Sequence, residues 1–222
     1  MTDTAALISE LGRDLRPVRR LRPPAWRAAL WLSAAVAVTG LLVLRHGLRP
    51  DLAGHFAQPG FVLEFAGEFA TAIGAALGAF YLSVPGRSRL WALAAAPGAL
   101  LWLSEMGYGC WSDWLTFGPD GLALGPSFAC FEFIATTTIP LSAALLFLLR
   151  YAAPVRPATT AMFATLSVAS LAAAGQSLMH GLDTSIMILV WHLGSVAILL
   201  ALARFAGPRL LQRYYEPPAE TR

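Results

Sequence analysis

Among the side chains that can bind metal ions, exchange protons or react as thiols, eight that lie within or close to apolar stretches stand out. They are Glu64, Glu68, Glu105, Glu132, His180, His192, Cys110 and Cys130. Carboxylates, imidazoles and thiolates are common ligands of metal ions, and histidine changes its charge near neutral pH. These residue types indicate metal binding, proton sensing or thiol chemistry, and we treat the eight as candidate sensor residues.

Some of these side chains are spaced to share one face of a helix. Glu64 and Glu68 lie four residues apart, and Gln176 and His180 repeat that spacing. Ionisable groups in the middle of a membrane-spanning helix cost about 2.5–3.5 kcal/mol and usually mark function. A simpler interpretation stays open, in which the glutamates reach water and the histidines bond between helices. The sequence indicates no permanent cofactor, although transient metal binding is compatible with this residue set.

The spacing of the two cysteines and the absence of catalytic motifs argue against a disulfide- or zinc-stabilised domain and against an enzyme. Cys110 and Cys130 have neither CxxC nor finger-like Cys/His spacing, so a disulfide framework and a structural zinc site are not indicated. Whether the two thiols pair stays open. The chain contains no GxSxG or HExxH motif, and we expect that it is not an enzyme.

The elements that must position these residues are apolar helices. Hydrophobic residues make up 57% of the 222 residues and charged residues 13%, and the mean hydropathy is +0.60. A membrane-spanning helix needs about 17–25 apolar residues, and an open sheet cannot satisfy its edges in lipid. The sequence therefore predicts an all-α polytopic membrane protein with six transmembrane helices, over residues 28–44, 61–84, 90–106, 128–149, 158–179 and 185–202.

The distribution of arginine predicts the orientation of these helices. Fourteen of the sixteen arginines fall in the amino-terminal arm, in the loops after the second and fourth apolar runs and after the sixth run, whereas Arg45 and Arg49 lie on the other side. The positive-inside rule then places both termini in the cytoplasm and the candidate sensor residues toward the periplasm. We expect an arm over residues 1–27, a bundle over 28–205 and a tail over 206–222. The net charge of +3 is too small to predict direct nucleic-acid binding.

The arm contains a short amphipathic pattern. Over residues 4–15, Leu7, Ile8, Leu11 and Leu15 form an apolar stripe with the spacing of a helix. Such a helix can lie on the membrane surface or dock into a groove of a cytoplasmic protein. Both interpretations stay open from the pattern alone.

Several strings occur in an order that resembles the NrsF family of bacterial membrane anti-sigma factors. The strings are RPVRRLRPP, LRPDL, SVPGRSR, GCWSDWLTFGPDGLALGPSFACFEFI and LVWHLGSV. The resemblance implies a six-helix protein of the bacterial inner membrane whose cytoplasmic arm binds an extracytoplasmic-function (ECF) sigma factor. It also implies that outward-facing residues sense a stress such as metals. Cys130 matches a cysteine of the family, but Gly181 follows His180 where similar proteins tend to place another cysteine.

The expected function is therefore that of an anti-sigma factor in the lipid bilayer. Leu7, Ile8, Leu11 and Leu15 would bind the sigma factor, and a stress signal on the periplasmic side, such as a metal or a redox change, would release it. The alternative is a small proton- or cation-coupled transporter in which Glu64, Glu68, Glu132 and His192 relay the ion. The sequence does not define the oligomeric state.

Overall fold

The described part of the chain is helical throughout its regular elements. The computed structural model describes residues 4–13, 21–119, 128–149, 155–179 and 189–213. The elements are α1 (Thr4–Arg13), α2 (Pro24–His46), α3 (Leu52–Phe56), α4 (Pro59–Leu82), η1 (Arg89–Leu93), α5 (Ala96–Phe117), α6 (Phe128–Leu149), α7 (Pro157–Ser177), η4 (Leu189–Leu193) and α9 (Gly194–Arg213). No strand occurs over these residues, and the all-α prediction is confirmed for them.

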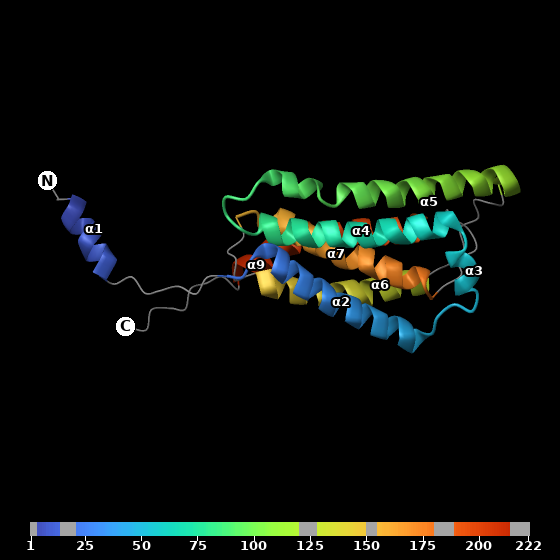
Figure 1. Ribbon diagram of the computed structural model, residues 1–222, viewed down its shortest axis with the longest axis horizontal. Coiled ribbons are helices and arrows are strands. Elements are labelled where there is room, and N and C mark those ends of the chain that lie inside the picture. Colours follow the sequence, from blue (N-terminus) through green and yellow to red (C-terminus); the bar gives the residue numbers. More distant parts are fainter. Residues whose placement is uncertain (1–3, 14–20, 120–127, 150–154, 180–188, 214–222) are drawn as a thin grey trace.

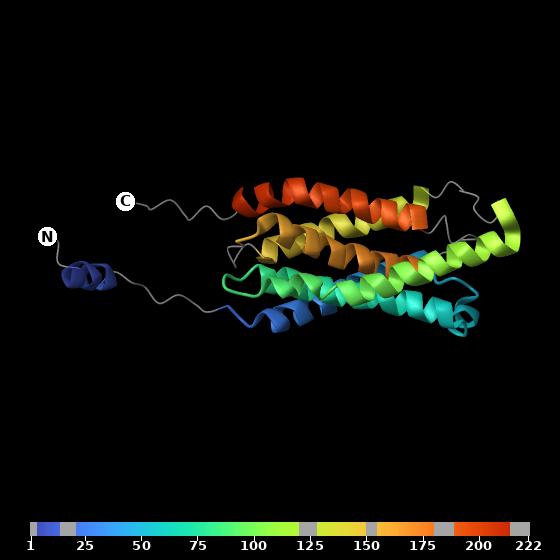
Figure 2. The same cartoon turned by 90° about the horizontal axis from the view of Figure 1, so that it is seen from above.

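Six long helices, α2, α4, α5, α6, α7 and α9, run side by side along one axis with alternating direction (Figures 1 and 2). The beginning of α2 and the end of α9 lie at the same end of this bundle, which we call the near end. The opposite end, where α2 ends and α4 begins, is the far end. α3 lies at the far end, and α1 lies beyond the near end (Figure 1).

Within the described residues, five helical segments are long and apolar enough to cross a membrane, which marks the chain as a membrane protein. They are α2, α4, residues Phe131–Leu149 of α6, α7, and the segment Leu189–Leu211 formed by η4 and most of α9. The sixth predicted span, 90–106, is not confirmed. It is divided between η1 and α5, because Pro97 lacks an amide hydrogen and favours the first turn of a helix, and α5 continues into polar residues such as Ser112 and Asp113.

The predicted boundaries and orientation have different outcomes. α9 continues to Arg213, so the first part of the predicted tail is helical. The division into arm, bundle and tail stays a prediction. The alternating direction of the long helices puts the start of α2 and the end of α9 at the same end of the bundle, but which end faces the cytoplasm stays a prediction.

Helix α7 forms the centre of the bundle because its residues are small. It packs against α2, α4, α6 and α9. Its buried residues include Ala164, Ala169 and Ala173, and small side chains let the backbones of membrane helices approach closely. The Ser167 hydroxyl donates a hydrogen bond to the Ala72 carbonyl oxygen of α4 at 2.8 Å, which fixes these two helices against each other.

Glycines bring α4 and α5 into backbone contact. A Cβ added to Gly67 would lie 2.7 Å from the backbone nitrogen of Trp102, and a Cβ on Gly98 would overlap the backbone of Ala70 and Thr71. Gly74 of α4 has no room for a Cβ either, because that atom would lie against the backbone of Ala94 and Ala95 just before α5. This seam sets the register in which the glutamates of α4 face α5.

Every side chain that the structure describes in helix α1 is exposed. Leu7 is 49% exposed and Ile8 65% exposed, although both are apolar. The helix ends at Arg13 in the described range, while residue 15 of the predicted helix lies outside that range. The apolar stripe of α1 is therefore not covered by the described part of the bundle.

Candidate functional site

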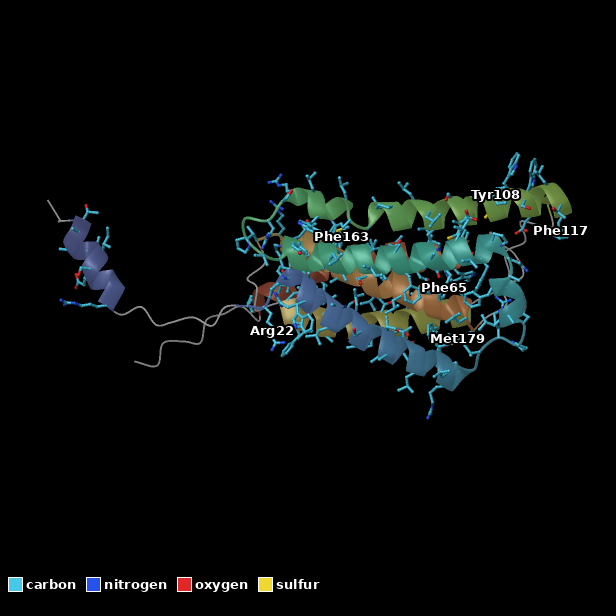
Figure 3. All side chains as sticks on the ribbon, in the orientation of Figure 1. Arg22, Phe65, Tyr108, Phe117, Phe163 and Met179 are labelled. Carbon is cyan, nitrogen blue, oxygen red and sulfur yellow. The ribbon has the colours of Figure 1, made fainter. Side chains whose placement is uncertain are left out.

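A polar pocket of about 250 Å³ opens at the far end of the bundle, and we call it the far-end pocket. Four of its titratable lining residues are Arg49, Glu64, Glu105 and His192. They come from the loop after α2, from α4, from α5 and from η4, so parts of the chain far apart in sequence meet there. Tyr108 on α5 also lines the pocket, and Figure 3 shows it with Phe65 of α4 in the half of the bundle away from Arg22.

Three carboxylates of this region lie on two adjacent helices. Glu64 and Glu68 are one turn apart on α4, and a Cβ added to Gly60 would lie 3.6 Å from Oε2 of Glu105, so the α5 carboxylate reaches the first turn of α4. Glu68 is completely buried. The Ser177 hydroxyl lies 3.4 Å from both Glu68 carboxylate oxygens and donates to them. Within the described ranges, none of the three carboxylates forms an ion pair.

Arg49 is held at the rim of the pocket by Asp51 and His55. Its Nε donates to Oδ1 of Asp51 at 2.7 Å and its terminal nitrogen to Oδ2 at 3.0 Å, and His55 Nε2 lies 2.8 Å from Oδ2. The hydrogen bond from Arg49 holds the pKa of Asp51 well below its usual range, and His55 adds to this effect. The backbone amide of Arg49 donates to the Leu178 carbonyl oxygen at 3.0 Å, which ties this loop to the end of α7.

Two buried polar side chains complete the inner wall. Gln176 on α7 and His192 on η4 are each 1% exposed and both line the pocket. Neither side-chain atom of the Gln176 amide has a hydrogen-bond partner among the residues that the structure describes. His192 lies in the π-helical turn η4, a local widening that is frequent at functional sites.

The structure places the predicted sensor residues in three groups. Glu64, Glu105 and His192 line the far-end pocket, and Glu68 is joined to its wall through Ser177. Glu132 is exposed on α6, and Cys110 is a half-buried free thiol on α5; neither is among the lining residues. His180 and the side chain of Cys130 lie outside the described residues. The sensory roles of all eight stay predictions.

The structure describes the side chains of only two of the four residues predicted to contact a partner. Leu7 and Ile8 are exposed on α1, as docking would require. The side chain of Leu11 and the whole of Leu15 lie outside the described residues. The binding role of this stripe stays a prediction.

Sequence reasoning missed several pocket residues. Arg49, His55, Gln58 and Tyr108 line the pocket, but the sequence analysis considered only Arg49 among them, and only for the orientation of the helices. The RPD string at Arg49–Asp51 was the available signal, because an arginine two residues before an aspartate can pair with it in a turn. Ser177 gave no signal that distinguishes it from the other small residues of α7.

The described residues do not contain a group of three or more His, Cys, Asp or Glu side chains placed to hold a metal ion. The glutamates and histidines are thus distributed around a space larger than a metal ion. Metal binding at this end of the protein stays a prediction.

The described chain thus combines apolar helices long enough to span a membrane with a polar pocket at one end of the bundle and an exposed amphipathic helix beyond the other. The model of the NrsF family, described as negative regulator of sigma F, matches residues 11–213. The chain belongs to this family. No curated protein and no solved structure matches it in the corresponding comparisons.

Proposed function

We propose that the protein is a membrane anti-sigma factor that binds an ECF-type sigma factor through α1 and releases it when a stress signal acts at the far end. The observation that supports this best is the exposed apolar stripe of α1 in a family of negative regulators of sigma F. In the bacterial inner membrane the near end would face the cytoplasm and the far end the periplasm, in agreement with the arginine distribution.

The stripe is suited to docking because α1 gains stability on binding. Isolated helices shorter than about 12–15 residues are marginal in water, and α1 has 10 residues. Burying one leucine or isoleucine side chain contributes about 1.5–3 kcal/mol. A groove on the sigma factor that covers Leu7 and Ile8 would supply the free energy that orders the helix, a common mode of helix recognition.

Release of the sigma factor requires that the helical bundle has two arrangements and that the stimulus binds one of them more tightly than the other. A difference of about 3 kcal/mol changes the ratio of two states about a hundredfold. The far-end pocket is where we propose that the stimulus acts, because segments far apart in the chain, including α4, α5, α7 and η4, meet there.

Affinity capture tests the docking surface. Full-length protein should capture a sigma factor from cells, and the double variant Leu7→Asp, Ile8→Asp should capture at least about tenfold less, since two apolar contacts are lost. The matched control is Glu10→Gln, which lies off the stripe of α1 and should leave capture unchanged. Equal capture by the wild type and the double variant, or no sigma factor in any sample, would contradict the proposal.

Transport, the alternative function, requires polar groups through the thickness of the bundle. The acidic residues of the described helices of the bundle, Glu64, Glu68, Glu105, Asp113 and Glu132, lie toward the far end. This one-sided placement supports a binding site more than a through-pathway.

A further inference from the structure

We propose that the far-end pocket binds a small organic cation, an amine in its ammonium form. The proposal rests on the proposed function, because it names the chemical class of the ligand that acts at the far end. Three independent features of the pocket support it: its charge, an unsatisfied amide and its size.

The charge of the pocket favours a cation. Arg49, the guanidinium in the lining, is paired with Asp51, so its charge is offset within the rim. Glu64 and Glu105 then remain in the lining, with Glu68 hydrogen-bonded to its wall, and no ion pair compensates these carboxylates within the described part of the chain. Buried charges are normally paired or neutralised. A ligand with a positive charge would supply the missing partner.

The amide of Gln176 indicates that the ligand has hydrogen-bond donors. Its side chain is 1% exposed, lines the pocket and has no partner among the described residues. Leaving a buried acceptor without a donor costs about 1–3 kcal/mol. An ammonium group carries several N–H donors, one of which can reach Oε1 of Gln176 while others reach the carboxylates.

The size and lining of the pocket favour an organic ion over a metal ion. The volume of about 250 Å³ is close to the lower limit of small-molecule sites, roughly 300–1,000 Å³. Phe61 and Tyr108 contribute aromatic rings, and an ammonium group is attracted to the face of such rings. The carboxylates and imidazoles of the described residues are not grouped as metal ligands would be.

Titration of the full-length protein in lipid nanodiscs tests the proposal. Putrescine, a diamine, is the probe, and 1,4-butanediol is a neutral molecule of similar length. Mg²⁺ tests for an inorganic cation. The variants are Glu105→Gln, which removes a lining charge, and Gln176→Leu, which removes the amide at similar volume. The matched control is Asp113→Asn, the same change of charge two turns further along α5 and outside the lining.

We expect saturable binding of putrescine by the wild type and the control, and none of butanediol. Loss of a charge-assisted hydrogen bond should weaken binding at least about tenfold in each lining variant. Thermal unfolding without ligand checks that each variant is folded. If only one of the two lining variants folds, its binding of putrescine is compared with that of the wild type.

Three results would overturn the inference. They are no saturable binding of putrescine by the wild type at millimolar concentration, equal binding by wild type and folded lining variants, and Mg²⁺ binding that needs Glu105 without putrescine binding. Capture of a sigma factor is measured on the same preparations. Intact capture without putrescine binding overturns only this inference, whereas putrescine binding without capture overturns the proposed function and leaves the pocket assignment in place.

Discussion

At the scale of single residues, the rim of the far-end pocket depends on the contact between Arg49 and Asp51. The arginine side chain is 10% exposed, while that of Asp51 is 60% exposed, so the pair lies at the boundary between pocket and solvent. Exposed ion pairs contribute little to stability, but a bidentate pair fixes geometry. Its main effect is to orient the Arg49 guanidinium beside His55.

The pH dependence of this pair follows from the depressed pKa of Asp51. A carboxyl group whose pKa falls on folding stabilises the fold fully above its unfolded value, about 3.9, and this contribution is lost as the pH falls through the lower folded value. In the Arg49→Gln variant the pKa of Asp51 should return toward about 3.9. The stability deficit of the variant relative to the wild type should then be present at pH 7 and shrink in acid.

The measurement is the carboxyl chemical shift of Asp51 followed by NMR through an acid titration, together with thermal unfolding at neutral and acid pH. Arg45→Gln serves as the control, because Arg45 is exposed on α2 and belongs to the same outer arginine pair. An Asp51 titration that is the same in the wild type and in Arg49→Gln would show that the guanidinium does not hold the carboxylate.

At the scale of elements, the glycine seam between α4 and α5 decides whether the carboxylates of these two helices share one pocket. The backbones of α4 and α5 lie so close together that there is no room for a Cβ at Gly98 or Gly67. A shift of one turn along α5 would move Glu105 by about 5.4 Å away from Glu64. The seam is thus a packing feature with a direct effect on the geometry of the site.

Gly98→Ala should destabilise the protein by about 1–3 kcal/mol, because the added methyl group forces the two backbones apart. The control is Gly107→Ala on the same helix, where a Cβ would meet no atom within 4 Å. That change should be neutral or stabilise by up to about 1 kcal/mol through helix propensity. Denaturant unfolding in detergent measures both, and equal stability of the two variants would show that the seam is not tightly packed.

The sequence predicted the elements better than it predicted their contacts. A continuous apolar run long enough to span a membrane has to make its backbone hydrogen bonds within itself, so a helix is the only structure open to it. This is why the predicted run 128–149 and α6 coincide. The four-residue spacing correctly put Glu64 and Glu68 on the same side of α4. The pattern of residues contains no information on the rotation of α6 about its axis, so the exposure of Glu132 could not be predicted. The contact of Arg49 with the end of α7 could not be predicted either, because it joins residues far apart in the chain.

At the scale of the whole molecule, the near end and the far end have different chemistry. Exposed α1 lies beyond the near end (Figures 1 and 2). The polar pocket is lined by residues of α3, of the first turns of α4 and of the end of α7, which lie at the far end. A protein of this plan can act as a signalling device only if the two ends face different compartments. The orientation in the membrane is therefore the property that most needs a direct measurement.

Thiol labelling in intact cells measures that orientation. With Cys130→Ser as background, Cys110 should react with a membrane-impermeant maleimide from outside, because it lies toward the far end of α5 and is half-buried rather than enclosed. In the variant Cys110→Ser, Cys130→Ser, Ser88→Cys, the new thiol lies in the exposed near-end loop and should react only after the membrane is permeabilised. The reverse pattern would place α1 in the periplasm.

The helix α2 connects the loop of Arg49 to the chain that leads to α1. Its 23 residues correspond to a rod of about 35 Å, given the rise of about 1.5 Å per residue. If such a rod pivots at the Arg49 end by about 10°, its first turn moves by roughly 6 Å, more than one helical turn. A small rotation of α2 that repacks its buried residues Ala28 and Trp31 would thus displace the attachment point of the amino-terminal arm by the width of a side chain.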